Sequence, residues 1–143
     1  MSDVAADPLA NISVGQSDNY TRTVTDADIV LFAGVSGDDN PVHINEPWAA
    51  ATMFKGRIAH GMLSASYIST VIGTRLPGPG TIYMGQSLKF KAPVRIGDTV
   101  TATVTVREIN EEKRRLTLDT VCTVGETVVI DGEAMVMLPK PPS

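Results

Sequence analysis

Two spacings of apolar residues divide the chain into a helical part and a part made of strands. Between residues 60 and 74, apolar side chains recur at helical spacing around nearly the whole circumference, interrupted by small hydroxyl residues. A helix of that kind is usually buried. From residue 81 onward, apolar and polar residues alternate, which is typical of strands with one buried face. The pattern therefore predicts one long buried helix and a mostly antiparallel sheet that it covers.

The remaining elements follow from caps and turns. Strand candidates span residues 18–24, 81–90, 99–109, 116–124 and 127–138, so a sheet of about five or six strands is expected. Thr25 and Asp28 form a capping-box pattern that opens a helix ending near Gly37. Asn45, Glu46 and Pro47 have the pattern of a cap, an acidic first-turn residue and an early proline, and a short helix is expected at residues 48–53. A sheet wrapped around one central helix is the simplest arrangement of these elements, and it is an α+β fold.

The length of 143 residues fits one domain. Residues 1–15 are small, polar and without period, so we expect a loose leader before a single domain at residues 16–143. The start of the chain carries Asp3 and Asp7 and no apolar run, which argues against a signal peptide and for a cytoplasmic protein. The longest apolar region, residues 58–72, is too short and too polar to cross a membrane.

Composition excludes several functions. A net charge of -4 argues against nucleic acid as the main partner, because phosphate backbones require a basic face. One cysteine, Cys122, and two histidines offer no recognisable spacing for a metal site, so no metal is expected. Cys122 lies in a strand pattern and is best interpreted as a small core residue.

The candidate chemistry begins with Asp38 and His43, five positions apart in a stretch that reads as a turn. Between them, Asn40 and Pro41 favour a sharp turn, and Asn40 could orient its neighbours. A carboxylate and an imidazole that project toward a common point could activate a water and return its proton. The alternative is that Asp38 caps the turn and His43 is a structural histidine.

The second candidate is Gly61, which follows His60 at the start of the long helix. N–H groups at a helix start lack partners and carry a positive partial charge, and glycine allows a ligand to approach them closely. A thioester carbonyl docked there would have its oxyanion stabilised. Alternatively, Gly61 only permits tight packing. His60 is either a core histidine or a residue that orients the turn.

Two further sets are weaker. Ser64, Ser66 and Ser69 lie in the helix, where serines most often bond back to the preceding turn. One of them could instead orient Asp38 or His43, and none has the context of a nucleophile elbow. Lys89 and Lys91 share one face at a strand end and could bind the phosphates of a nucleotide-bearing substrate. The alternative for each lysine is ordinary solvated surface.

These residues together resemble a family. The stretch GDDNPVH at residues 37–43 and the stretch IAHGML at residues 58–63 resemble the hydratase signature of MaoC-like proteins, most closely the short (R)-specific enoyl-CoA hydratases. The stretches at residues 83–90 and 92–98 continue the resemblance, which extends from about residue 15 to residue 138. It implies the hot-dog fold, in which an antiparallel sheet wraps a long central helix.

The resemblance also implies an activity, the reversible hydration of a trans-2-enoyl-CoA to a (3R)-3-hydroxyacyl-CoA. Asp38 and His43 match the catalytic pair of the family, and Gly61 matches the glycine whose N–H polarises the thioester carbonyl. Ser69 falls where related hydratases have a serine near the pair. The family works as homodimers that bind acyl-CoA near the subunit interface, without a metal or redox cofactor.

Other functions stay open at this point. The same residues would serve a dehydratase acting on a 3-hydroxyacyl chain bound to a carrier protein, or on 3-hydroxybutyryl-CoA. A hot-dog thioesterase would direct the activated water at the carbonyl carbon. A non-catalytic acyl-CoA-binding subunit is disfavoured, because such subunits lack the pair and this chain keeps both Asp38 and His43. The sequence does not set which of the two is the base.

Overall fold

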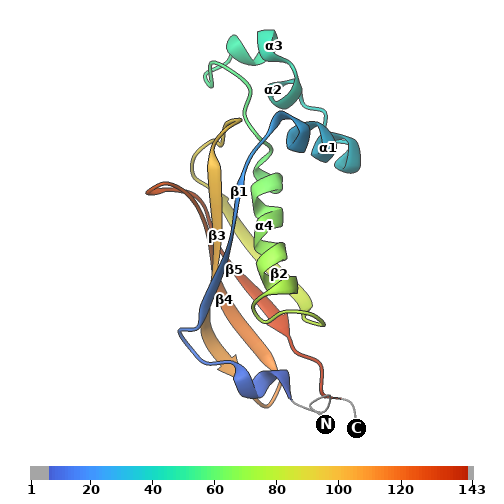
Figure 1. Cartoon of the computed structure of the whole chain (residues 1–143), viewed down its shortest axis with the longest axis vertical. Helices are drawn as coiled ribbons and strands as arrows, with labels where there is room; N and C mark the ends of the chain where they lie inside the picture. Colours follow the sequence, from blue (N-terminus) through green and yellow to red (C-terminus); the bar gives the residue numbers. More distant parts are fainter. Residues whose placement is uncertain (1–6, 142–143) are drawn as a thin grey trace.

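The structure, a computed structural model, describes residues 7–141 and contains one antiparallel sheet. Five strands follow one another across it in the order β1-β3-β4-β5-β2. Their bounds are Ser17–Thr23 for β1, Ile82–Phe90 for β2, Thr99–Asn110 for β3, Arg115–Val124 for β4 and Thr127–Met137 for β5. The helix α4 (Gly61–Thr74) lies lengthwise against this sheet (Figure 1). The predicted arrangement of a sheet around one long helix is therefore confirmed.

The hydrophobic core lies between the buried face of α4 and the buried face of the sheet. On β3 and β4 every second side chain is buried, as the alternating pattern predicts. The face of α4 that packs on them is buried at Leu63, Tyr67, Ile68, Val71 and Ile72. Each such burial contributes about 1.5–3 kcal/mol relative to an exposed side chain. The opposite face of α4, which includes Ser66 and Ser69, is exposed, because an open five-stranded sheet covers one side of the helix only.

Within the described residues, three α-helices precede α4, and each begins after a residue whose side chain caps it. The predicted capping box of α1 (Asp26–Ser36) is present between Thr25 and Asp28, and the helix ends at Gly37 in a left-handed conformation with φ 81°. Asn40 caps α2 (Pro41–Ile44) and Asn45 caps α3 (Glu46–Ala50). The predicted cap at Asn45 and early proline of the helix expected at residues 48–53 are present, and the helix itself spans Glu46–Ala50, which is shorter at its end than expected.

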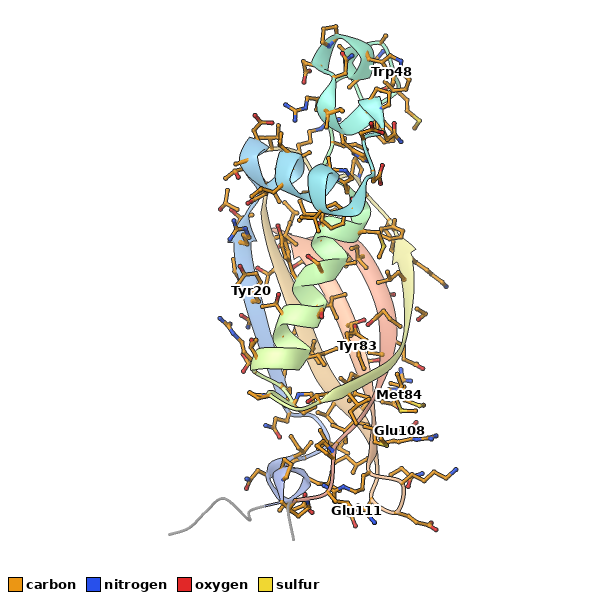
Figure 2. All side chains as sticks on the ribbon, turned by 90° about the vertical axis from the view of Figure 1, so that its right-hand side faces the viewer. Tyr20, Trp48, Tyr83, Met84, Glu108 and Glu111 are labelled. Atoms are coloured by element: carbon orange, nitrogen blue, oxygen red, sulfur yellow. The ribbon has the colours of Figure 1, made fainter. Side chains whose placement is uncertain are left out.

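The three short helices gather beyond the end of the sheet at which α4 begins (Figure 1). Trp48 of α3 marks the far end of this group, and Glu111 in the turn after β3 marks the opposite end of the molecule (Figure 2). The tip of α4 therefore faces the loops of α1, α2 and α3, and the candidate chemistry meets there.

Part of the expected leader is described, and it is anchored to the domain. Residues 8–11 form a short 3-10 helix capped by Asp7. Both carboxylate oxygens of Asp7 accept hydrogen bonds from Arg114, at 2.6 and 2.9 Å, and Arg114 also donates to the carbonyl of Leu138. Residues 1–6 of that leader lie outside the described residues. Within residues 7–141, no helix is both long and apolar enough to span a membrane.

Candidate active site

Asp38 and His43 are held by the turn that joins α1 to α2. Asp38 lies in the loop and is exposed, and one of its carboxylate oxygens accepts a hydrogen bond from the Asn40 amide at 3.3 Å. The side chain of Asn40 in turn accepts from the amide of Val42 in the first turn of α2, and the next residue, His43, is 8% exposed. Asn40 thus shapes the turn that presents the pair, in agreement with the prediction for the Asn40–Pro41 bend.

The protonation of His43 follows from its partners. Its Nδ1 lies 2.8 Å from the carbonyl oxygen of Ile58. A carbonyl only accepts, so Nδ1 carries the proton and Nε2 keeps a free lone pair. Burial lowers the pKa of His43, and the neighbouring His60 ring lowers it further, against the opposing effects of the Ile58 bond and of Asp38. His43 is therefore neutral near pH 7 and able to accept a proton through Nε2.

His60 joins this pair from the tip of α4. Potential ligand atoms of Asp38, His43 and His60 all lie within 4.8 Å of one another. These three are the group within the described chain that could be considered for a metal. The two imidazoles, however, stack with ring centroids 3.9 Å apart and planes at 29°. Stacked rings present their lone pairs side by side and not toward one ion, so the arrangement suits proton transfer better than metal ligation.

Gly61 is the first residue of α4, where an amide has no carbonyl one turn earlier to bond. A Cβ added at Gly61 would lie 2.6 Å from Cδ1 and Cε1 of Phe90. The close approach of an aromatic ring thus favours glycine at this position, which is the packing role that the sequence left open. The same absence of a side chain would allow a ligand to approach the amide, and the oxyanion-binding role of Gly61 stays a prediction.

The pair and the helix tip open into one cavity of about 540 Å³. That volume is within the range of about 300–1,000 Å³ typical of small-molecule sites. Asp38, His43, His60 and Gly61 all line it. Apolar wall is supplied by Met53, Phe54, Met62, Phe90, Val129 and Ile130. An apolar chain with one polar, reactive end matches this lining.

The structure separates the remaining candidates. Lys91 lines the cavity. Lys89 does not line it: it pairs with Asp131 across the β2–β5 register, although the strand alternation placed both lysines on one face. The chain leaves β2 at Phe90, so the alternation does not extend to Lys91. Ser69 lies on the exposed face of α4 and is likewise outside the residues that line this cavity.

Two residues that line the cavity were not predicted as such. Phe90 was not singled out, and Ser64 was given a different role. Phe90 was only one apolar position in a strand, and nothing local indicates that its ring reaches Gly61. Ser64, interpreted as a serine bonded to its own helix, is 1% exposed, and its Oγ has no hydrogen-bond partner within the described chain. Its position one turn after His60 was the available signal.

A long helix packed on an antiparallel sheet in this arrangement defines the hot-dog fold. Residues 11–129 match the model of the MaoC like domain, and the chain belongs to this family. The confirmed family also agrees with the resemblance carried by the stretches at residues 37–43 and 58–63.

Relatives of known name share most of the chain. An (R)-specific enoyl-CoA hydratase of Rhodospirillum rubrum is 63% identical over 129 residues, which cover 90% of each chain. A 3-hydroxybutyryl-CoA dehydratase of Methylorubrum extorquens is 49% identical over 91% of this chain and 83% of its own. The solved structure of R-hydratase PhaJ1 from Pseudomonas aeruginosa, in its unliganded form, superposes with a TM-score of 0.88 at 48% identity, over 93% of this chain and 86% of that one.

Proposed function

We propose that this protein catalyses the reversible addition of water to a trans-2-enoyl-CoA, giving a (3R)-3-hydroxyacyl-CoA. The observation that carries the proposal is the meeting of Asp38, His43 and the first amide of α4 in one apolar cavity. Relatives named as an (R)-specific enoyl-CoA hydratase and a 3-hydroxybutyryl-CoA dehydratase support the same reaction in its two directions.

In the proposed mechanism, Asp38 and His43 hold one water between them. The free Nε2 of His43 and the Asp38 carboxylate are both acceptors, so the pair takes one proton as the water oxygen bonds to C3. The electron pair of the C2–C3 double bond moves onto the thioester oxygen. The Gly61 N–H and the positive end of α4 stabilise that oxygen. The pair then delivers its proton to C2, which completes the addition.

The substrate would enter with its acyl chain against the apolar wall and its thioester at the tip of α4. Lys91, at the cavity, is the candidate contact for a phosphate of CoA. Lys89, opposite Asp131, would contribute through its charge at a greater distance. Neither a metal nor a redox cofactor is required by the proposed steps.

The reverse reaction, dehydration, is also supported, because one relative is named a 3-hydroxybutyryl-CoA dehydratase. Dehydration of a 3-hydroxyacyl thioester runs the same proton transfers in reverse. Comparing turnover on CoA and carrier-protein thioesters, in both directions, decides which substrate the site prefers.

We propose further that the protein acts as a homodimer. Strand β2 stands at an edge of the sheet, and its side chains Ile82, Tyr83 and Met84 are exposed (Figure 2). An uncovered apolar edge strand favours pairing with another chain. Light scattering coupled to size exclusion tests this proposal, with Met84→Lys as the variant expected to yield monomer. A monomeric wild-type protein at micromolar concentration would refute it.

The activity is tested by absorbance at the enoyl-thioester band with crotonyl-CoA, followed by chiral analysis of the product. Asp38→Asn and His43→Gln are each expected to lower kcat by at least about a hundredfold, in the range of general acid–base contributions. Their melting temperatures, compared with that of the wild type, serve as the control for folding. Hydration at the wild-type rate by either variant would remove that residue from the mechanism, and release of free thiol would favour a thioesterase.

A further inference from the structure

The side chain of His60 contacts both the His43 ring and the loop that carries Asp38, beside the tip of α4. His60 is the residue immediately before α4, so its backbone adjoins the Gly61 amide. Its ring is 1% exposed and stacks on His43, with centroids 3.9 Å apart. On another side it meets Phe32 of α1, with centroids 4.8 Å apart and planes at 56°. The ring therefore lies between α1, α2 and the tip of α4.

The polar contact of His60 is directed at the catalytic loop. Its Nε2 lies 2.8 Å from the main-chain carbonyl oxygen of Asp38. Because that carbonyl only accepts, Nε2 carries the proton and donates it. The other ring nitrogen, Nδ1, is buried and has no hydrogen-bond partner within the described chain. The bond to the Asp38 carbonyl thus fixes the ring tautomer, with a proton on Nε2.

Because its Nδ1 has no partner within the described chain, His60 is a poor choice for packing alone, and its Nε2 hydrogen bond is the feature that an apolar residue could not supply. A phenylalanine or leucine would fill the same buried position without leaving a polar atom unsatisfied. What only a histidine or another donor supplies is the bond to the Asp38 carbonyl. The other hydrogen bonds around Asp38 are local, since its amide bonds Ser36 and its carboxylate bonds the Asn40 amide. The bond from His60 is the long-range contact in this set, linking positions 22 apart in the chain.

We infer that His60 is a positioning residue, which fixes the distance between the Asp38–His43 pair and the amide at the tip of α4. This inference rests on the proposed hydratase function for its kinetic consequence. His60 acts through the Asp38 main chain and the His43 ring, and it does not take part in proton transfer. Without its donor, the loop at residues 37–40 keeps local bonds only, and the carboxylate drifts relative to the thioester. A displacement of about 1 Å can cost about a hundredfold in rate.

Three variants separate positioning from packing. His60→Phe keeps the ring and the stack but removes the donor. His60→Gln keeps an N–H donor at the same number of bonds from Cα and removes the ring. Phe32→Leu is the matched control, because it loosens packing against His60 and leaves the bond to Asp38 in place. Each variant is measured for kcat and KM with crotonyl-CoA, for melting temperature, and for amide hydrogen exchange across residues 37–43.

We expect His60→Phe to lower kcat by about tenfold to a hundredfold with KM within about threefold of wild type, since binding surfaces are unchanged while the reacting groups shift. Amide exchange across residues 37–43 should rise by a similar factor. His60→Gln should recover most of both losses, and Phe32→Leu should keep the wild-type kcat even with a lower melting temperature.

The inference is overturned if His60→Phe retains the wild-type kcat and exchange, if His60→Gln is no better than His60→Phe, or if Phe32→Leu loses as much kcat. The exchange measurement does not depend on turnover. A wild-type protein without hydratase activity would therefore refute the proposed function, while the exchange rates of the three variants would still decide whether His60 holds the loop.

Discussion

Gly61 offers the sharpest test of how the site is built, because alanine at this position keeps the amide and changes only the space beside it. The added Cβ would stand 2.6 Å from the Phe90 ring, whereas ordinary contacts lie at 3.4–4 Å. The ring must therefore move by about 1 Å. Forcing extra atoms into a packed site typically costs about 1–3 kcal/mol. Phe90 is 54% exposed, so its ring can swing away, and we expect the loss of stability to fall at or below the lower end of that range.

The displaced ring has consequences for activity, because Phe90 is part of the cavity wall. Gly61→Ala is expected to lower kcat/KM for crotonyl-CoA by about tenfold to a hundredfold, which corresponds to about 1.4–2.7 kcal/mol of transition-state stabilisation. Phe90→Ala removes the obstructing ring. The double variant Gly61→Ala/Phe90→Ala should therefore be no less active than Phe90→Ala alone, with a coupling of about 1 kcal/mol or more between the two positions.

The assay is the initial rate of loss of enoyl-thioester absorbance, with melting curves for all four proteins. Gly61→Ala with wild-type kcat/KM would contradict the close packing of Phe90. A double variant as poor as the product of the two single effects would show that the alanine acts on the amide itself, and the argument from the ring would fail.

Other outcomes follow from the same structure. Because the pKa of His43 is depressed by burial, its neutral form persists below the ordinary value of about 6.5, so the acid limb of kcat/KM should lie below that pH. The free energy of unfolding should decline as pH falls through the same range, because the His43 side chain binds a proton more readily in the unfolded chain than in the folded one. His43→Gln should remove that part of the decline in thermal unfolding curves. Asp28→Asn weakens both the α1 capping box and the 2.6 Å pair with Arg22, so a lower melting temperature with unchanged kcat is expected; an unchanged melting temperature would contradict this role. Gly132→Ala would place a Cβ into the Ser87 carbonyl oxygen of the neighbouring strand, so insoluble or strongly destabilised protein is expected on expression, whereas Gly73→Ala, at an open position, should fold normally.

The elements that sequence patterns predict well are those decided locally. The capping box at Thr25, the alternation along β3 and the apolar face of α4 each depend on residues a few positions apart, and each is present. The turn that presents Asp38 likewise follows from its immediate neighbours. The cap of α3 at Asn45 is likewise local and present, whereas the helix ends at Ala50, three residues before the expected end.

The contacts that complete the site could not be predicted, because they join distant positions. Phe90 reaches Gly61 from a strand 29 positions later, and His60 reaches the Asp38 carbonyl from 22 positions later. Spacing along the chain carries no information on such approaches. The strand alternation grouped Lys89 with Lys91. Strand β2 ends at Phe90, between them, and Lys91 lines the cavity whereas Lys89 does not.

The turn that carries Asp38 and His43 is hydrogen-bonded to residue 58 and to His60 at the helix tip, whereas Val129 and Ile130 of the cavity wall belong to β5. Under the proposed function, recognition of the acyl tail and activation of water would thus fall to separate parts of the scaffold. Reshaping the β5 wall should retune which tails are accepted while the proton-handling turn stays intact, so this division makes the protein a suitable starting point for engineered variants with altered tail preference.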